Sequence, residues 1–569
     1  MPYKIKPIDR DQVMFCTLDS LVGKESIARI IDAFVENIDL SKLEFKKFKS
    51  AQTGRSSYDP ASLLKLYIYG YRKNIRSSRK LAEACEANID IMWMLGGLKP
   101  DFRTIADFRK ENIKCLKGVF KEFTKRVTVD IKTGFVSIDG SKFKAWNSKD
   151  ANFTITKLDD RIKWLEDKSE EYLRQLDSAD KSDDSEGNFT KEELEAKLAE
   201  IKERQERYES YRKYMEENNL SQMSLTDPEA KLMKNKNGMD VSYNIQTAVD
   251  SETHLILDYC ETNQVTDHGL MAPTAETLKM ESETIVEVVA DKGYDQAKDM
   301  IACLEKGIIP NVVLPDGKDE YNLEIEYREA EDADASSILP SEIKKCLHSG
   351  KIPKAYEKVI KEMEVVEVRR KIKGNGSEKI ESPYASEEEM RARARNGYYV
   401  RDPERDLVIC PNEEILRKKS IKKNWTTRYA NKHACSKCPY RNKCVSDKGI
   451  TKWKEIDFNK DILEKKAKWW DDGPNNDGTK KKRGVKSKFE KIKVVRFKLH
   501  PDREKMDKRK NISEHPFGTI KRAMGASYFL LKGKRKIGGE TALFSLGYNL
   551  SRAENMFKFE DLIRKVSIA

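Results

Sequence analysis

The sequence predicts a mixed α/β fold, in which helices cover the faces of a mixed β-sheet, and three observations support this prediction. Short apolar runs, typical of strands, recur between residues 135 and 314. Helical runs at 268–280 and 295–305 separate the later strands. Strands that alternate with helices are typical of a sheet with crossover helices. The runs expected to be strands are 135–138, 241–250, 254–262, 284–290 and 308–314.

Length and charge narrow the class of protein. A chain of 569 residues exceeds the size of a single hydrophobic core, so we expect several modules. Its 109 Lys and Arg residues against 96 Asp and Glu give a net charge of +13. This excess favours a polyanionic partner; a well-solvated ordinary protein is the alternative. No apolar stretch approaches the roughly 20 residues that cross a bilayer, and "MPYKIKPIDR" lacks a secretory segment. We therefore expect a cytoplasmic protein without a membrane partner.

The N-terminal part, residues 58–122, has the pattern of short helices. Asp59 can cap a helix that has Pro60 in its first turn, and Ser78 can open a second helix. The basic turn "RKNIRSSRK" joins these helices, and "PDFRTIADFRKEN" opens a third. This pattern predicts a small helical DNA-binding module; the alternative is a plain helical bundle with a solvated charged face.

Residues 156–220 carry an apolar seam typical of a coiled coil. Its spacing alternates between four and three residues on two helices, which the polar stretch "DSADKSDDSEGNFT" separates. We therefore expect an antiparallel coiled-coil hairpin inserted into the sheet domain. The seam positions are Leu158, Ile162, Leu165, Ser169, Tyr172, Leu176, Leu194, Leu198, Ile201, Gln205 and Tyr208.

Two carboxylates lie where the chain order predicts neighbouring positions in the sheet. Asp139 lies within the first strand, in "GFVSIDGSKFKAW", and Asp291 directly follows the fourth strand, in "VVADKGYD". Ligand and metal sites in open α/β sheets gather at strand ends and switch points. Taken singly, Asp139 could be a turn residue before Gly140, and Asp291 could cap the next helix. Only their combination indicates chemistry.

The helices after residue 510 are expected to supply a third acid, because a divalent cation takes at most one more protein oxygen here. Glu514 is the candidate. Lys521 lies seven residues later on the same helical face and would present a cation to phosphate. Pro516 requires that the helix either starts at Ser513, as its cap, or kinks there. The rival third acids are Glu504 and Glu540.

These acids and their surroundings resemble a known family. Asp139 in "SIDGSKFKAWNSKDANFT", Asp291 in "VVADKGYD" and Glu514 in "SEHPFGTIKRAMG" resemble the Asp-Asp-Glu (DDE) triad of bacterial insertion-sequence transposases with an RNase H-like core. The resemblance is strongest to the group whose third acid lies in a signature of Tyr, two residues, Arg, three residues, Glu, six residues and Lys. The helical segments "YDPASLLKLYIYGY" and "PDFRTIADFRKEN" match as well. The resemblance thus covers most of the chain outside 318–500.

The signature itself is only partly kept. Glu514 and Lys521 match it, but Asp507 stands at its tyrosine position and Lys510 at its arginine position, with Arg509 one place away. A lysine keeps the charge but lacks the bidentate fork of arginine. The departure weakens the expectation that position 510 grips a phosphate.

The resemblance implies a metal-dependent DNA transposase. Asp139, Asp291 and Glu514 would bind two Mg²⁺ or Mn²⁺ ions, which would promote attack first by water and then by the released 3′-hydroxyl. The partners would be double-stranded DNA, namely the element's inverted repeats and the target, and a second copy of the chain in a dimer. Phosphate contacts are expected from Lys142, Lys292, Lys510, Lys521 and Arg522. The alternatives are a catalytically silent DNA-binding relative and an RNase H-like nuclease of another purpose.

Four cysteines predict a structural zinc site. Cys435, Cys438 and Cys444 occur in "CSKCPYRNKC", and Cys410 lies upstream in "VICPN". Four thiolates complete a tetrahedral Zn²⁺ site. His433 could replace one cysteine, an iron–sulfur cluster takes the same ligands, and buried free thiols are the alternative without metal.

These features divide the chain into five parts. They are a helical DNA-binding domain (1–125), the first part of an RNase H-like catalytic core (130–155 and 221–317), the coiled-coil insertion (156–220), an insertion with the zinc site and a basic linker (318–500), and C-terminal helices that complete the core (501–569). The basic tract "KKKRGVKSKFEKIK" at 480–493 is expected to add sequence-independent phosphate contacts or to act as a solvated linker.

Overall fold

The computed structural model contains two compact units, residues Met1–Val366 with Lys493–Ala569 and residues Glu367–Ile492. Each is described by itself. The phosphate contacts expected from residues 480–488 fall outside the described residues. The structure describes residues 11, 13, 15–46, 58–132, 134–179, 191–235, 238–279, 284–315, 318–371, 386–403, 405–421, 426–445, 453–459, 462–467, 469–470 and 489–568.

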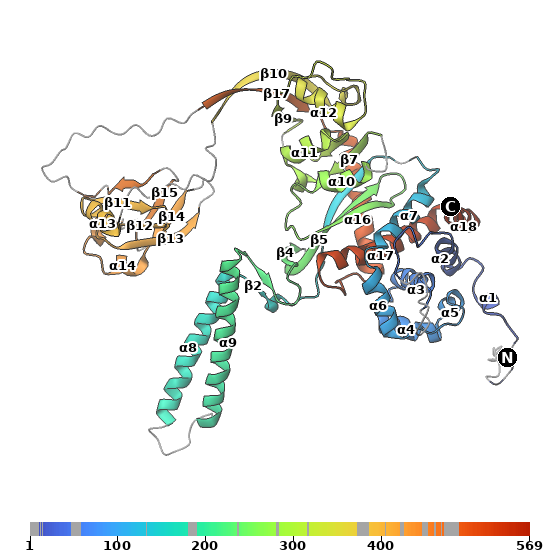
Figure 1. Ribbon diagram of the computed structural model, residues 1–569, viewed down its shortest axis with the longest axis horizontal. Helices are drawn as coiled ribbons and strands as arrows, with labels where there is room; N and C mark the ends of the chain where they lie inside the picture. The colour runs from blue at the N-terminus through green and yellow to red at the C-terminus, as the bar shows by residue number, and fades with distance from the viewer. Residues whose placement is uncertain are drawn as a thin grey trace, which may run out of the picture. The chain divides into compact units, whose positions relative to one another are not determined.

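A mixed six-stranded sheet forms the centre of the first unit (Figure 1). Its strands run in the order β4-β5-β1-β7-β8, and β6 pairs with the second half of β5. β1 is antiparallel to β5 and parallel to β7, and β7 is parallel to β8. The mixed α/β fold is therefore confirmed. The strands are β1 (Val136–Lys144), β4 (Lys231–Asn235), β5 (Gly238–Asp250), β6 (Ile256–Thr262), β7 (Val286–Ala290) and β8 (Ile308–Val312).

Hydrophobic cores cover both faces of this sheet. On one face, Ile138 and Val288 pack with residues of α10 (Met271–Lys279) and α11 (Ala297–Leu304). On the other face, Phe143 packs with residues of the C-terminal helices. Because successive side chains of a strand point to opposite faces, neighbouring residues of β1 serve different layers. The short helix η2 (Lys292–Tyr294) connects β7 to α11.

The C-terminal helices are α16 (Arg503–Gly518), the π-helical turn η4 (Thr519–Ala523), α17 (Lys534–Met556) and α18 (Phe559–Ser567). α16 begins after Asp502, whose side chain accepts from the Lys505 amide at 3.3 Å. It continues through Ser513 and Pro516, so the expectation that the helix starts at Ser513 is wrong. A proline lacks an amide donor, and the helix widens into the π turn directly after it.

The N-terminal helices follow the predicted caps. Asp59 accepts from the Ala61 amide at 3.1 Å with Pro60 at the first helical position, and Asp101 caps the helix of "FRTIADFRKEN". Ser77 stands at the cap next to the predicted Ser78. The helices are α1 (Leu18–Leu21), α2 (Ile27–Glu36), α3 (Pro60–Arg72), α4 (Ser78–Ala87), α5 (Ile89–Met94), α6 (Phe102–Asn112) and α7 (Leu116–Thr128).

Helix α17 joins the N-terminal helices to the sheet. It packs against α3, α7 and β6, and one hydrophobic core runs through all of them. At its centre the buried Asn549 behaves like a strand neighbour: its Oδ1 accepts from the Ile256 amide at 2.9 Å, and its Nδ2 donates to the Ile256 carbonyl at 2.8 Å. Although α17 is largely buried, no helix among the described residues is long and apolar enough to span a membrane.

The coiled-coil insertion consists of α8 (Ile155–Ala179) and α9 (Lys191–Glu217), which pack against each other (Figure 1). The predicted seam positions Leu158, Leu165 and Leu194 are buried. The short strands β2 (Asn152–Phe153) and β3 (Met223–Ser224) pair at its base, and η1 (Lys149–Ala151) precedes it. The insertion therefore leaves and rejoins the sheet domain through one small ladder.

The segment after β8 forms two further sheets. The first has the order β10-β17-β9, and the second, in the unit Glu367–Ile492, has the order β15-β14-β13-β12-β11-β16. The elements are β9 (Tyr321–Glu326), α12 (Pro340–Ser349), η3 (Lys354–Tyr356), β10 (Ile360–Lys371), α13 (Glu387–Arg395), β11 (Tyr398–Asp402), β12 (Leu407–Ile409), β13 (Ile415–Ile421), β14 (Thr427–Ala430), α14 (Lys432–Ser436), α15 (Arg441–Cys444), β15 (Glu455–Phe458), β16 (Glu464–Lys466) and β17 (Phe489–Leu499).

Asn549→Ala should lower the thermal stability of the protein, because the amide and carbonyl of Ile256 would lose their buried partner. The expected loss is about 2 kcal/mol, the cost of leaving buried polar groups unsatisfied. Thermal unfolding followed by near-UV circular dichroism measures it. Asn218→Ala, an exposed position on the coiled coil, is the control. Equal melting temperatures for the two variants would contradict the role of Asn549.

Candidate active site

The pairing register of β1 and β7 places Asp139 beside Asp291. The parallel ladder pairs Ile138 with Ala290, so the two acids follow as the next neighbours, and strands lie about 4.8 Å apart. Asp291 also caps η2, because its Oδ1 accepts from the Gly293 amide at 2.8 Å. The capping role and the position beside Asp139 are therefore compatible.

Burial, and next the charge of Asp291, raise the pKa of Asp139 to about 6. The Arg509 guanidinium, the Gly140 amide and the Ser513 hydroxyl oppose this shift. The Asp139 side chain is only 20% exposed, so water screens the repulsion between the two carboxylates weakly. The site thus holds two like charges close together at neutral pH.

Helix α16 supplies the groups that face this pair. Arg509 Nη1 lies 4.0 Å from Asp139 Oδ2. Ser513, one turn later, is fully buried, and its hydroxyl donates to the Arg509 carbonyl at 3.1 Å. Residues four apart share one helical face, so both side chains point toward β1. Arg509 Nε is buried and has no hydrogen-bond partner among the described residues.

Glu514 lies on the same helix, but its side chain is exposed. Across the described residues, no three His, Cys, Asp or Glu side chains are arranged to hold a metal ion. The structure therefore brings Asp139 and Asp291 together and leaves Glu514 in solvent on the helix that covers them. The rotation of about 100° per residue explains why Ser513, and not Glu514, faces Asp139.

The rival third acids have other surroundings. Glu504 is exposed in the first turn of α16. Glu540 is fully buried, and its carboxylate accepts from the amides of Leu530 and Leu531 at 3.0 to 3.2 Å. Burial raises the pKa of Glu540, and Arg109 counteracts this. Glu540 is therefore a structural acid of the chain before α17.

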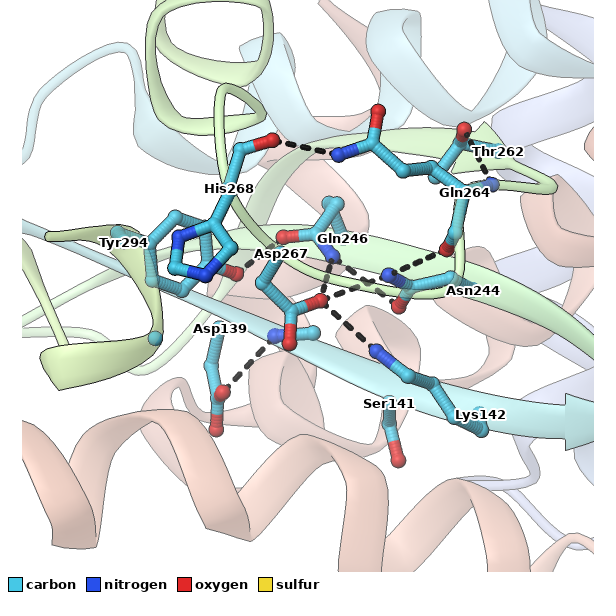
Figure 2. A network of polar contacts seen from close by, with 12 residues as sticks. Asp139, Ser141, Lys142, Asn244, Gln246, Thr262, Gln264, Asp267, His268 and Tyr294 are labelled. Atoms are coloured by element: carbon cyan, nitrogen blue, oxygen red, sulfur yellow. Dashed lines mark hydrogen bonds and ion pairs between the residues drawn. The ribbon is translucent and has the colours of Figure 1, made fainter. Parts of the chain in front are cut away.

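A polar network lies on the opposite face of β1 (Figure 2). Asp267 Oδ1 accepts from Lys142 Nζ at 2.8 Å, from Asn244 Nδ2 at 2.7 Å and from Gln246 Nε2 at 2.9 Å. Gln246 Oε1 in turn accepts from the Tyr294 hydroxyl. Because Tyr294 belongs to η2, the network fastens the turn that Asp291 caps to strand β5.

Gly140 makes room for this network. A Cβ atom there would collide with Gln246 Nε2 and Asp267 Oδ1. Gly140 pairs with Gln246 across the ladder, so the amide side chain lies directly over it. Asp139 and Gly140 therefore serve opposite faces of β1, one for the acid pair and one for its support.

The cations expected at DNA phosphates fall into two groups. Lys142 is paired with Asp267 and is 13% exposed, and Lys521 Nζ donates to Ser141 Oγ at 2.6 Å and to the Lys142 carbonyl at 2.9 Å. Both thus have partners within the protein. The others have exposed side chains, and their phosphate contacts stay predictions: these are Lys292, Lys510 and Arg522.

The four cysteines of the second unit are free thiols. Burial, and also the neighbouring Cys438 and Cys435, raise the pKa of Cys410 to about 11. Cys444 Sγ lies 3.0 Å from the Tyr399 hydroxyl. Zinc binds thiolates, whereas burial here favours the protonated thiol, and in the described part of this unit no metal-holding group is present. The structure does not support the zinc site predicted at these cysteines, with or without His433.

Several residues of the site were not recognised from the sequence, although two signals point to them. Asn244 and Gln246 are polar residues two apart in an otherwise apolar strand, so both face the same side and need buried partners. The spacing of four between Arg509 and Ser513 likewise indicates one helical face. Asp267 lies in the loop before α10 and carries no such signal.

Comparisons with known families agree with this architecture. Residues 16–111 match the family model described as "Transposase domain (DUF772)". Residues 226–550, more than half of the 569, match the model described as "Transposase DDE domain". Comparisons with curated proteins and with solved structures give no significant match. A sheet that holds two neighbouring acids, together with a match over most of that sheet and the C-terminal helices, places this chain in the DDE transposase family, whose DDE domain has an RNase H-like fold.

Proposed function

We propose that this transposase catalyses metal-dependent cleavage and strand transfer at the inverted repeats of an insertion sequence. One observation carries the proposal: the register of β1 and β7 holds Asp139 and Asp291 side by side, with the pKa of Asp139 raised to about 6. A protein keeps two repelling carboxylates in a partly buried position when a cation joins them.

The side chains present suit a divalent cation with oxygen ligands. Asp139 and Asp291 provide carboxylate oxygens, the ligands that Mg²⁺ and Mn²⁺ prefer. Glu514 is the third ligand we propose, since α16 already lies against β1 and β7. When bound, the metal ions would activate the attacking oxygen and stabilise the leaving 3′ oxygen.

The protein's own groups prepare this site. Arg509 and the Ser513 hydroxyl favour the ionised form of Asp139, which is the form that accepts a metal ion. The buried Arg509 Nε, which has no hydrogen-bond partner within the described chain, is a donor for an oxygen of the DNA backbone. Lys292, Lys510 and Arg522 are exposed and would add salt-sensitive phosphate contacts.

The proposed partner is double-stranded DNA, first the element's ends and then the target. The N-terminal helices would read the inverted repeat. Joining two ends in one event requires two copies of the chain, so a dimer would form on DNA. A silent DNA-binding protein would bind the same ends without cutting them, and a nuclease of another purpose would cut without joining.

Cleavage of a duplex that carries the flanking inverted repeat should require Mg²⁺, Asp291 and Glu514. Asp291→Asn and Glu514→Gln should each lower the cleavage rate at least about 100-fold, because a lost metal ligand removes transition-state stabilisation. Glu504→Gln, a rival acid of the same helix, is the matched control and should cut normally. Joining of a 3′-ended donor oligonucleotide into plasmid DNA excludes the nuclease. Unchanged cleavage by Asp291→Asn would refute the proposal.

The Mg²⁺ concentration for half-maximal cleavage should depend on pH. Asp139 has a pKa of about 6 without metal, so protons compete with metal below that pH. The half-maximal concentration should rise about tenfold per pH unit below 6 and level off above it. Titrations from pH 5 to 8, with metal-free DNA binding measured in parallel, test this. A constant half-maximal concentration between pH 5 and 7 would contradict the role of Asp139.

Asp139→Asn should stabilise the metal-free protein while abolishing cleavage. The folded-state pKa of about 6 lies above the ordinary value of 3.8, so ionisation of Asp139 above pH 6 costs about 2 kcal/mol. In EDTA at pH 8 the variant should melt at a higher temperature than the wild type. This advantage should shrink as the pH falls from 6 toward 4. Asp167→Asn, at an exposed position of α8, is the control, and a lower melting temperature for Asp139→Asn at pH 8 would contradict the prediction.

A further inference from the structure

Two exposed aromatic side chains lie together at the end of β1, outside the acid site. Trp146 is 47% exposed and Tyr528 is 37% exposed, and their ring centroids are 5.7 Å apart. They come from segments almost 400 residues apart in the chain, which a bridge between Lys144 and Tyr528 joins. The Phe529 amide also donates to the Lys144 carbonyl at 2.9 Å. The tertiary structure thus assembles an aromatic pair on the surface.

Buried charges hold Tyr528 in place. Arg76, with a side chain only 9% exposed, donates to the Tyr528 carbonyl at 2.9 Å, and its guanidinium lies 5.2 Å from the centre of the Tyr528 ring. Glu540 lies 3.8 Å from Arg76 and accepts from the next two amides, those of Leu530 and Leu531. A buried ion pair is costly unless its geometry is satisfied. Here it makes an exposed ring rigid, and a rigid ring loses little entropy when a ligand stacks on it.

A cavity of about 320 Å³ opens beside the aromatic pair. Among the side chains that line it, one is cationic and none is acidic. Asn147 is nearly buried, and its Oδ1 accepts from the Thr226 amide at 3.0 Å, which fixes the opposite wall. A volume near 300 Å³ is the lower end of small-molecule sites, the scale of one nucleoside. The lining includes Lys144, Trp146, Asn147, Ser148, Thr226 and Tyr528.

The cavity lies on the same strand as the acid pair. Lys144 is five residues beyond Asp139 in β1, a distance of about 17 Å at 3.3 to 3.4 Å per residue. Each base of duplex DNA advances by about 3.4 Å. DNA with a phosphate at Asp139 therefore reaches the cavity with a nucleotide roughly five positions away, or closer if that strand is unstacked and extended.

We propose that Trp146 and Tyr528 hold one unstacked nucleobase of the DNA end, with Lys144 toward its phosphate. This inference rests on the proposed function, since it takes the bound strand to pass Asp139. Aromatic side chains stack on any base, and enzymes that act on DNA capture flipped bases between such side chains. The absence of acids from the cavity lining suits a polyanion.

A double-mutant cycle between protein and DNA tests the proposal. The probes are duplexes of the terminal inverted repeat, intact or with one abasic site at each position from one to eight beside the cleavage point. Binding is measured without divalent metal. Trp146→Ala should weaken binding of the intact duplex at least about fivefold, and Trp146→Phe should restore most of it. At one abasic position, wild type and Trp146→Ala should bind equally.

Matched controls separate stacking from other effects. Trp164→Ala removes another exposed tryptophan, on the coiled coil (56% exposed), and should bind like the wild type. Thermal unfolding checks that Trp146→Ala is folded. The proposal is overturned if Trp146→Ala binds the intact duplex normally, if its loss is equal at every abasic position, or if it changes only the oligomeric state in sedimentation, which would indicate a contact between copies.

The outcome is distinguishable from that of the catalytic proposal. Asp291→Asn should keep the full Trp146 effect on binding, because it leaves the aromatic pair intact. Normal cutting by Asp291→Asn would refute the catalytic assignment while the stacking result stood. Loss of cutting by Asp291→Asn together with an unchanged Trp146→Ala would refute only the stacking site.

Discussion

The repulsion between Asp139 and Asp291 is the constraint around which the first unit is arranged. Two carboxylates on adjacent parallel strands, one of them 20% exposed, destabilise the folded chain at neutral pH. The chain offsets this cost locally, with the Arg509 guanidinium at 4.0 Å, the Gly140 amide and the Ser513 hydroxyl. These groups reduce the repulsion but do not remove it, since the pKa of Asp139 stays raised. Such an arrangement is typical of a site that awaits a cation.

Strand β1 can hold this arrangement because its two faces have different tasks. The side chains of Asp139 and Ser141 point toward the C-terminal helices, whereas Gly140 and Lys142 point toward Asp267. The Asp267 network ties β1, β5 and η2 together through fully used donors and acceptors. Satisfied buried networks give rigid local structure. The second acid is therefore positioned from behind the sheet, by residues that never face the site.

The C-terminal helices connect this site to the rest of the unit. α16 covers the acids, and α17 carries Asn549 against β6 and Glu540 against the segment that holds Tyr528. The N-terminal helices share the hydrophobic core of α17, and Arg76 from them supports Tyr528. A DNA-contacting surface assembled in this way draws on the first, middle and last parts of the first unit. Small changes in the packing of α17 would thus affect both binding and chemistry.

The sequence by itself determined the strand and helix order of the sheet, the caps at Asp59 and Asp101, the coiled-coil seam and the identity of Asp139 and Asp291. These features depend on local periodicity, on capping chemistry and on motifs, all of which lie within short windows of residues. Tertiary structure alone decided which side of α16 meets the acids, because a continuous helix from Arg503 through Pro516 sets that rotation and turns Glu514 outward. It also decided that Lys142 pairs with Asp267, that Glu540 is structural and that the cysteines remain protonated. Each of these outcomes depends on burial and on partners that lie far away in the chain, which no local pattern encodes.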